Sequence, residues 1–294
     1  MWLKTVKTRL NRTAIHFVCK MKADHSERWK TSRYGFIIII VPLYIMKVEA
    51  QLPKTIVNFL KEKGYPGLRL RAMLFDMDGV LFDSMKNHTL AWYKAISDVG
   101  IACERDEFYQ YEGATGRWTI NHLFQRAFNR KATDEEVENI YAEKSRYFNE
   151  LPEAGAMPGV KEMLEKVLQR GIIPVLVTGS GQHSLLDRLD REFPGVFTRD
   201  RMVTAFDVCH GKPHPEPYLK GLEKAGVQAC EAVVVENAIL GVQAGVAAGI
   251  LTVAVNTGPL EEQQLLAAGA AVVFSDMTAW TNYFDKFVDD LSVI

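Results

Sequence analysis

The most informative segment of this chain reads Met73-Leu74-Phe75-Asp76-Met77-Asp78-Gly79-Val80-Leu81-Phe82-Asp83-Ser84. The run 71–75 predicts a buried strand, and Gly79 marks the loop that follows it. Asp76 and Asp78 therefore stand at the carboxyl end of a strand, where α/β sheets bind ligands. Like charges this close raise one another's pKa, and a hard divalent cation such as Mg2+ relieves that repulsion. One carboxylate can then attack phosphorus while the other moves a proton, although two surface aspartates in a loop would give the same pattern.

The segment resembles the first motif of the haloacid dehalogenase (HAD) superfamily of phosphotransferases, which here reads Asp76-x-Asp78-Gly79-Val80-Leu81-x-Asp83-Ser84. The resemblance implies that Asp76 is the nucleophile that becomes an aspartyl phosphate. It also implies that Asp78 is the general acid and base. The spacing alone indicates only a site where carboxylates hold a metal ion.

Length and composition limit the alternatives. The 294 residues suffice for one large or two moderate domains with a sizeable core. Hydrophobic residues make up 48% and charged residues 24%, as in ordinary globular proteins, and the net charge of −1 does not indicate a nucleic-acid partner. The four cysteines form no C-x-x-C pair and have no His-x-x-His partner, which predicts free thiols in a reducing compartment and argues against a zinc site; they are Cys19, Cys103, Cys209 and Cys230.

The first 52 residues differ from the rest and are assigned as an N-terminal extension. Residues 1–45 carry nine Lys and Arg against two acidic residues, which leaves 26 against 34 in the remainder. The apolar run at 36–46 is shorter than the ~20 residues of a membrane helix, and Pro42 interrupts it. The favoured interpretation is that Met46 is the true start; a signal or anchor cleaved after Ala50 and a disordered basic extension are the alternatives. The enzyme is accordingly expected in the cytoplasm, with export or membrane tethering through 36–46 as the alternative.

The rest of the chain alternates between helical and strand-like segments. A short amphipathic helix at 53–63 ends at Gly64, and helical spacing runs from 87 to 149 with a helix start at Thr133. Further helices are expected near 159, 183, 216, 240 and 261, and strands at 71–75, 172–178, 202–205, 232–236, 251–255 and 271–274. This alternation predicts an α/β protein with a doubly wound, Rossmann-like parallel sheet. The HAD resemblance implies an α/β core at 53–84 and 153–294 and an inserted helical cap at 85–152.

Two later segments supply groups suited to a phosphoryl group. Thr178-Gly179-Ser180 ends a strand with a hydroxyl and backbone N–H groups that can hold phosphoryl oxygens, and it resembles the second HAD motif. Lys212 lies in a loop with three prolines, where its ammonium can neutralise charge in the transition state. That loop resembles the third motif, which implies this role for Lys212. For the neighbouring His214 and Tyr218, packing is favoured over ligand contact.

The fourth motif departs from the family pattern. Glu236-Asn237 stands where the β-phosphoglucomutase-like branch has Glu-Asp, in which the Asp binds Mg2+. Asn237 keeps an amide oxygen for Mg2+ but removes a negative charge, so another carboxylate is needed. Glu112, in a turn of the cap, is the expected supplier, although a solvated surface glutamate would give the same pattern. The expected metal site comprises Asp76, Asp78, Glu112, Glu236 and Asn237, in which Glu236 is better suited to orienting the metal shell or Lys212 than to direct ligation.

Two cationic positions of the branch's mutases are missing. Gly116 stands at the Arg position that grips a sugar phosphate, and Gly181 stands at a Lys position; Arg117 is one residue away and could replace the first. His88 matches a cap-linker histidine of the mutases and keeps them as the second interpretation. The expected substrate contacts are His88, Glu112, Thr115, Gly179 and Ser180.

Glu112 together with Asn237 most closely resembles the HAD-type inorganic pyrophosphatase of Bacteroides-like bacteria, with Ala114 as a departure where an Arg is expected. A metal held jointly by core and cap favours a compact, highly charged substrate. The sequence therefore predicts a Mg2+-dependent phosphohydrolase acting on pyrophosphate, with a β-phosphoglucomutase or sugar-phosphate phosphatase as the alternative. A non-enzymatic binding protein that lost turnover through Asn237 is a hypothesis of another class. The expected partner is a small phosphorylated substrate, without nucleic acid or membrane, for a monomer or weak homo-oligomer.

Overall fold

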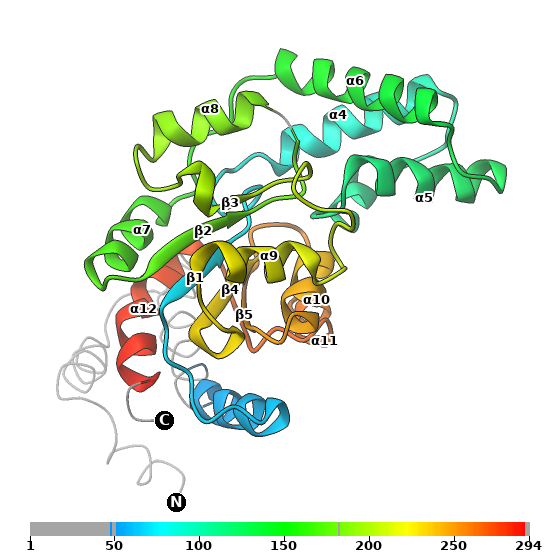
Figure 1. Ribbon diagram of the computed structural model, residues 1–294. Coiled ribbons are helices and arrows are strands. Elements are labelled where there is room, and N and C mark those ends of the chain that lie inside the picture. The colour runs from blue at the N-terminus through cyan, green and yellow to red at the C-terminus, as the bar shows by residue number, and fades with distance from the viewer. Residues whose placement is uncertain (1–47, 49–50, 182, 292–294) are drawn as a thin grey trace, which may run out of the picture. The chain divides into compact units, whose positions relative to one another are not determined.

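The computed structural model describes residues 48, 51–181 and 183–291, and Figure 1 shows their arrangement. The chain divides into two units, Met1–Lys47 and Val48–Ile294, and the described residues all belong to the second. The expectations for residues 1–47, including the membrane segment at 36–46, and for cleavage after Ala50 lie outside the described residues. Within the described part, no helix is both long and apolar enough to cross a membrane.

A six-stranded parallel sheet forms the centre of the second unit. The strands are β1 (Ala72–Phe75), β2 (Ile173–Val177), β3 (Met202–Val203), β4 (Ala232–Glu236), β5 (Leu251–Val255) and β6 (Val272–Phe274). Their order is β3-β2-β1-β4-β5-β6, and each neighbouring pair is parallel. β1 lies between β2 and β4, with Phe75 in register with Leu176 and Val235. The predicted doubly wound α/β fold is confirmed.

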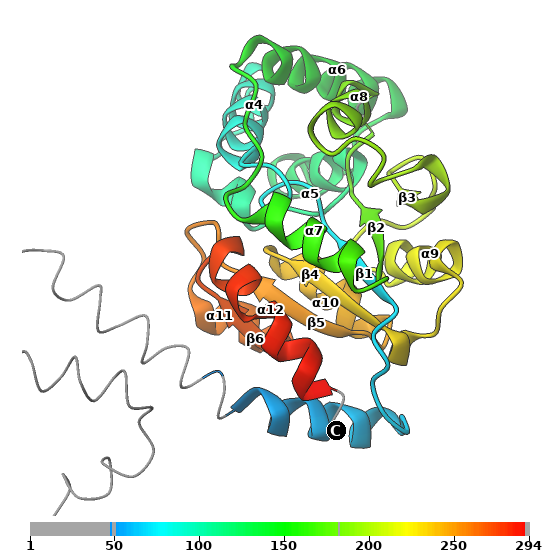
Figure 2. The same ribbon diagram turned by 90° about the vertical axis from the view of Figure 1, so that its left-hand side faces the viewer.

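Helices cover both faces of the sheet, as Figure 2 shows. On one face, α9 (Glu216–Ala225) and α10 (Ile239–Ala247) pack over a core that includes Leu74, Val175 and Val234. On the other, α7 (Val160–Gln169) lies beside α12 (Met277–Leu291), whose Trp280 contacts Phe274 at a ring-centroid distance of 4.9 Å. The core also contains a helix over residues 51–63, which confirms the helix predicted at 53–63. Its other helices are α8 (His183–Glu192) and α11 (Glu262–Ala267), with short 3-10 turns η2 (Arg199–Arg201) and η3 (Ala229–Glu231). Burial on both faces explains why the strands are apolar throughout rather than alternating.

A helical cap is inserted between β1 and α7 and lies beside the carboxyl ends of the strands (Figure 1). It consists of α4 (Met85–Asp98), η1 (Arg105–Tyr109), α5 (Gly116–Phe128) and α6 (Asp134–Glu150). The cap has a hydrophobic core of its own, which includes Ile96, Phe108 and Leu123. Thr133 and Glu136 form a capping box that begins α6, which confirms the helix start predicted at Thr133.

The predicted element bounds hold closely except at β3. β4 and β5 match their predicted ranges, whereas β3 ends at Val203 instead of Ala205. The chain turns at Thr204, because its N–H donates to Asp207 Oδ2 at 2.8 Å and its carbonyl oxygen accepts from Asp207 N–H at 3.0 Å. Helix α12 was not predicted, although its buried residues follow a helical spacing: Met277, Trp280, Thr281, Tyr283, Phe284, Phe287 and Leu291.

Candidate active site

The predicted catalytic residues meet at the carboxyl ends of three adjacent strands. Asp76 follows β1, Thr178 follows β2 and Asn237 follows β4. A cavity of about 60 Å³ lies between this edge of the sheet and the cap. The residues of interest that line it are Asp76, Asp78, Thr178, Gly179 and Ser180 from the core, and His88, Glu112, Ala114, Tyr141 and Lys144 from the cap. The cavity is therefore built jointly by core and cap.

Lys212 is the central cation of the site. Its Nζ donates to Asp76 Oδ1 at 2.5 Å, to Glu236 Oε1 at 2.6 Å and to the Val177 carbonyl at 3.0 Å. All three ammonium protons therefore have acceptors, although the side chain is only 1% exposed. Burial alone would lower the pKa of Lys212, but the charges of Asp76 and Glu236 raise it above its usual value. The ammonium is fixed against the predicted nucleophile.

Glu236 holds Lys212 in place. Its Oε1 also accepts from the Tyr218 hydroxyl at 2.8 Å, and its Oε2 accepts from the N–H groups of Asn237 at 2.9 Å and Ala238 at 3.2 Å. These contacts occupy both oxygens of the carboxylate. The arrangement favours the orienting role over direct metal ligation for Glu236. Tyr218 is fully buried beneath Lys212, with its ring centroid 5.1 Å from Nζ, which agrees with the packing role predicted for it.

The site carries more negative than positive charge. Burial raises the pKa of Asp76 to about 8, because the neighbouring carboxylates Glu236 and Asp78 add to the effect and Lys212 offsets it only in part. Burial also raises the pKa of Glu112 well above its usual value, and the charge of Asp76 contributes. Such shifts mark carboxylates whose charge is not fully compensated by the protein alone.

Asp78 belongs to a separate hydrogen-bonded chain that starts in the cap. Its Oδ1 accepts from Ser84 Oγ at 2.5 Å and lies 3.0 Å from His88 Nε2, and His88 Nδ1 lies 2.9 Å from Lys144 Nζ. Burial would raise the pKa of Asp78, but His88, Ser84 and Lys144 together hold it at about 2. Burial, together with the charge of Lys144, lowers the pKa of His88. A neutral His88 that accepts from Lys144 has its proton on Nε2 and donates it to Asp78.

Lys144 is a site residue that was not predicted from the sequence. It is 3% exposed and lies on the buried face of α6 with Val137, Ile140 and Phe148. A lysine at an apolar position of an amphipathic helix is the signal that could have identified it, because lysine is almost never buried without a partner. The same helix brings Tyr141 into the cavity.

Glu112 and Asn237 join the cap to the core. Asn237 Nδ2 donates to Glu112 Oε1 at 2.6 Å, and both side chains are buried. Gly79 makes this approach possible: a Cβ at that position would lie 2.0 Å from Asn237 Nδ2 and 3.0 Å from Glu112 Oε1. The geometry brings Glu112 and Asn237 into contact, and their role as metal ligands stays a prediction.

The donor set fits a hard divalent cation. Asn237 Oδ1 is buried and has no hydrogen-bond partner within the described chain, so it offers an oxygen to an ion. Asp76 and Glu112 supply carboxylates beside it. Among the described residues, only a cluster on the surface brings three His, Cys, Asp or Glu ligand atoms within 4.8 Å of one another. The acidic side chains of the catalytic site are therefore spaced more widely than this. Mg2+ needs few protein oxygens, however, because it usually keeps several waters.

Two residues of the sequence prediction lie elsewhere. Thr115 does not line the catalytic cavity; it is the N-cap of α5, where its Oγ1 accepts from Trp118 N–H at 3.3 Å. A substrate contact from Thr115 stays a prediction, and its hydroxyl already serves the start of the helix. Arg117 points to the surface and pairs with Asp134 at 2.5 Å, so it does not replace the missing cation of the cap turn.

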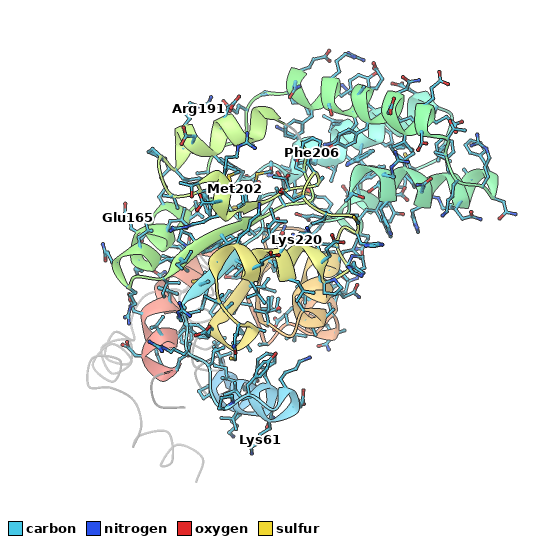
Figure 3. All side chains as sticks on the ribbon, viewed as in Figure 1. Lys61, Glu165, Arg191, Met202, Phe206 and Lys220 are labelled. Carbon is cyan, nitrogen blue, oxygen red and sulfur yellow. The ribbon has the colours of Figure 1, made fainter. Side chains whose placement is uncertain are left out.

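Aromatic side chains lie beside the two glycines that replace the mutase cations. A Cβ on Gly116 would lie 2.3 Å from Tyr141 Cδ2, and one on Gly181 would lie 3.0 Å from Phe206 Cζ. Phe206, in the loop after β3, is on the side of the sheet that faces the cap (Figure 3). Tyr141 of α6 lines the cavity together with Gly179 and Ser180 of the core. A long side chain at 116 would have to displace Tyr141.

Fold and site together define an enzyme of the α/β class whose reactive carboxylates follow the first strand of a parallel sheet. Residues 73–255 match the family model described as haloacid dehalogenase-like hydrolase, and the chain belongs to this family. Within it, the chain is an enzyme of the phosphatase and mutase group, and the predicted HAD resemblance is confirmed. Enzymes of the superfamily generally use Mg2+.

Three relatives indicate the branch. A "Phosphorylated carbohydrates phosphatase" of Thermotoga maritima is 32% identical over 206 residues, 69% of this chain and 94% of that protein. "Hexitol phosphatase A" of Escherichia coli is 31% identical, covering 64% of this chain and 84% of that protein. The solved structure described as "Putative beta-phosphoglucomutase from Bacteroides vulgatus" is 49% identical with a TM-score of 0.80, covering 82% of this chain and 98% of that one. These relatives support the β-phosphoglucomutase-like and sugar-phosphatase branch, and they do not support the closer resemblance to a pyrophosphatase.

Proposed function

We propose that this protein is a Mg2+-dependent phosphohydrolase that transfers the phosphoryl group of a small phosphorylated carbohydrate to Asp76 and then to water. The observation that carries the proposal is the bridge from Lys212 Nζ to Asp76 Oδ1 and Glu236 Oε1, at 2.5 and 2.6 Å. This bridge keeps a cation beside the nucleophile where charge develops during phosphoryl transfer. The carbohydrate class rests on the names of the two phosphatase relatives.

The chain's own residues account for both half-reactions. Asp76 attacks phosphorus as the bond to the leaving oxygen breaks, and Asp78 gives that oxygen a proton. Because Asp78 is ionised in the free protein, its proton must be supplied as the substrate binds. Asp78 then takes a proton from water, whose oxygen attacks phosphorus and releases phosphate and the Asp76 carboxylate. Thr178 and Lys212 hold the transferring group throughout.

Mg2+ fits beside Asp76, Glu112 and the unpaired Oδ1 of Asn237. When bound there, it would offset the excess negative charge and polarise the phosphoryl group. Glu112 comes from the cap, so closure of the cap would complete the ligand set.

Hydrolysis is favoured over a mutase reaction. A mutase must hold a bisphosphate in two orientations, which needs space and a second cationic grip. Arg117 at the expected cap turn pairs with Asp134 on the surface, so it does not supply that second grip. Gly181 offers no charge at the second position, where Phe206 lies close by.

Inorganic pyrophosphate is a second candidate substrate, favoured by one observation. The buried ammonium group of Lys144 lines the small cavity together with Glu112, and the buried Lys212 lies next to it against Asp76. A compact dianionic leaving group would meet Lys144 there, whereas the carbohydrate of a sugar phosphate needs the cap to stand further open.

Phosphate release in the presence of Mg2+ tests the proposal. Hexose, hexitol and pentose phosphates are compared with pyrophosphate, and the Asp76→Asn variant serves as the blank because it keeps the side-chain volume but lacks the nucleophile. We expect kcat/KM for the best carbohydrate phosphate to exceed that for pyrophosphate. A preference for pyrophosphate of about 100-fold, roughly 2.7 kcal/mol of transition-state stabilisation, would instead establish the second candidate.

Two further readouts complete the test. A trapped phosphoryl group on Asp76, detected by mass spectrometry after acid quench, is expected with the best substrate. Conversion of one hexose monophosphate isomer into another, without net phosphate release, would overturn hydrolysis in favour of the mutase reaction. Absence of turnover with every phosphate ester and with pyrophosphate would leave only the non-enzymatic binding role.

A further inference from the structure

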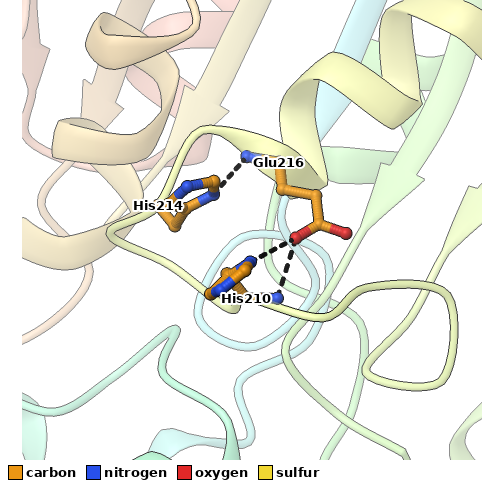
Figure 4. Close-up of side chains that lie close together, drawn as sticks. All are labelled: His210, His214 and Glu216. Carbon is orange, nitrogen blue, oxygen red and sulfur yellow. Dashed lines mark hydrogen bonds and ion pairs between the residues drawn. The ribbon is translucent and has the colours of Figure 1, made fainter.

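The loop that carries Lys212 also presents a cluster of metal-ligating side chains on the surface. His210, His214 and Glu216 each place a ligand atom within 4.8 Å of the other two. Figure 4 shows the three side chains close together. No other group of three His, Cys, Asp or Glu in the described part of the chain meets this spacing. We propose that this cluster is a second metal site, distinct from the catalytic one, for a borderline transition-metal ion of the Zn2+ class.

Backbone hydrogen bonds hold the Glu216 carboxylate in position without a metal ion. Glu216 Oε1 accepts from the Cys209 N–H at 2.9 Å, and Oε2 accepts from the His210 N–H at 2.8 Å. These bonds and the contact with His210 hold the pKa of Glu216 at about 2, so the carboxylate is charged at neutral pH. A preorganised anion lowers the entropic cost of forming a metal site.

Both histidines adjoin this carboxylate. His210 Nδ1 lies 3.0 Å from Glu216 Oε2, and His214 Nδ1 accepts from the Glu216 N–H at a longer 3.2 Å. Two ligands bound to one tetrahedral Zn2+ at about 2.1 Å lie about 3.4 Å apart, so the His210–Glu216 pair needs to move little. The imidazole rings of His210 and His214 are 4.6 Å apart between centroids, which places them on the same side of the loop.

The donor types decide the class of ion. Two imidazoles and one carboxylate are a set that Zn2+ uses, with water in the remaining position. Imidazole also suits Cu2+ and Ni2+, whereas Mg2+ prefers oxygen ligands and suits the buried carboxylates instead. Both histidines are exposed, so an ion can enter without opening the cap. Zinc was judged improbable from the sequence because there is no C-x-x-C pair and no His-x-x-His partner, and His210 and His214, four residues apart, match neither pattern.

The proposed metal site lies in the loop that carries the catalytic Lys212. Lys212 lies between His210 and His214 in the chain, and an ion held by both would brace the loop around the catalytic lysine. The loop also lies in close contact with the cap, because a Cβ on Gly211 would lie only 2.4 Å from Thr115 Cγ2. We therefore expect an ion bound here to raise the thermal stability of the protein by mass action.

Calorimetric titration of the full chain with Zn2+ in saturating Mg2+ tests the site, because Mg2+ occupies the catalytic oxygens. The wild type is compared with His210→Ala and His214→Ala. The matched control is His122→Ala, which removes a histidine of the cap that lies in the same surface groove but outside the cluster. We expect one Zn2+ site in the wild type and the control, and binding at least about tenfold weaker in the two cluster variants.

Thermal unfolding gives an independent readout. Zn2+ should raise Tm in the wild type and in His122→Ala but not in His210→Ala or His214→Ala, while phosphate release with Mg2+ alone stays unchanged in all four proteins. If an alanine variant is destabilised without metal, His214→Gln, which keeps most of the side-chain volume, replaces it. Zn2+ binding of equal affinity in the cluster variants would place the ion on cysteines or in the catalytic site and overturn the proposal. So would a wild type that binds no Zn2+ in saturating Mg2+.

Discussion

Gly79 shows how one backbone position connects the catalytic loop to the cap. Its φ of 85° is left-handed, and a Cβ there would lie 2.0 Å from Asn237 Nδ2. We expect Gly79→Ala to cost about 1–2 kcal/mol of stability through backbone strain alone, and to push Asn237 away from Glu112. Urea unfolding measures the first effect. The second should appear as a higher Mg2+ concentration for half-maximal phosphate release.

Gly64→Ala is the matched control for that substitution. Gly64 has a φ of 68°, but nothing beyond its chain neighbours lies within 4 Å of its Cβ position. The control should therefore lose stability by strain alone and keep the wild-type Mg2+ requirement. If the two variants need the same Mg2+ concentration, the close approach of Gly79 to Asn237 has no part in metal binding.

The shifted pKa of Lys144 predicts how the stability of the folded protein changes with pH. Burial lowers its pKa from 10.5 to about 8, although the charge of Asp78 acts in the opposite direction. The groups that face its Nζ are His88 Nδ1 at 2.9 Å and the rings of Trp92, Tyr141 and Phe148. Between pH 8 and 10.5 the unfolded chain keeps this proton while the folded protein has lost it. Stability contributed by this group therefore rises with pH across that window.

Lys144→Met tests this dependence, because methionine fills the same space without a charge. We expect the variant to be at least as stable as the wild type at pH 7, and to gain less stability than the wild type between pH 8 and 10.5. Its kcat should fall, since His88 loses the partner that orients it toward Asp78. Urea unfolding at a series of pH values, with phosphate release at pH 7, gives both results. A pH profile identical to the wild type would show that Lys144 is not the titrating group.

At the scale of elements, helix α5 presents its charged face away from the cavity. Arg117 is 55% exposed in its side chain and pairs with Asp134 at the surface. A surface ion pair contributes only about 0.2–1 kcal/mol, so Arg117→Ala should leave Tm nearly unchanged and kcat/KM within about twofold for every substrate. A loss of about tenfold or more, confined to sugar phosphates, would show that Arg117 reaches the substrate when the cap moves.

The strands and the residues that end them were the predictable part of this molecule. Asp76, Thr178 and Asn237 each follow an apolar run, and a parallel sheet brings the ends of such runs to one edge. Lys144 and Tyr141 were not predictable in this way, because their place depends on how α6 packs against α4 and the core. The early end of β3 was not predictable either, since the side chain of Asp207 ends the strand and apolar character does not show this.

At the scale of the whole second unit, the cap and the core share one set of buried charges. Glu112 and Lys144 belong to the cap, whereas Asp76, Lys212 and Asn237 belong to the core. The buried contacts between them include Asn237 Nδ2 to Glu112 Oε1, at 2.6 Å. Moving the cap away would expose these groups to water and separate Glu112 from the other expected metal ligands. Cap closure and metal binding should therefore be coupled.

Glu112→Ala tests this coupling. The substitution removes a carboxylate whose pKa burial already raises well above its usual value, so the fold loses little and Tm should change by no more than a few degrees. It also removes the only cap carboxylate of the expected metal site, and we expect the Mg2+ concentration for half-maximal activity to rise by about tenfold or more. Glu107→Ala is the control, because Glu107 is a cap glutamate that pairs with Arg126 outside the cavity. If both variants keep the wild-type Mg2+ dependence, Glu112 is no ligand, and Asn237 and Asp76 must hold the ion with water alone.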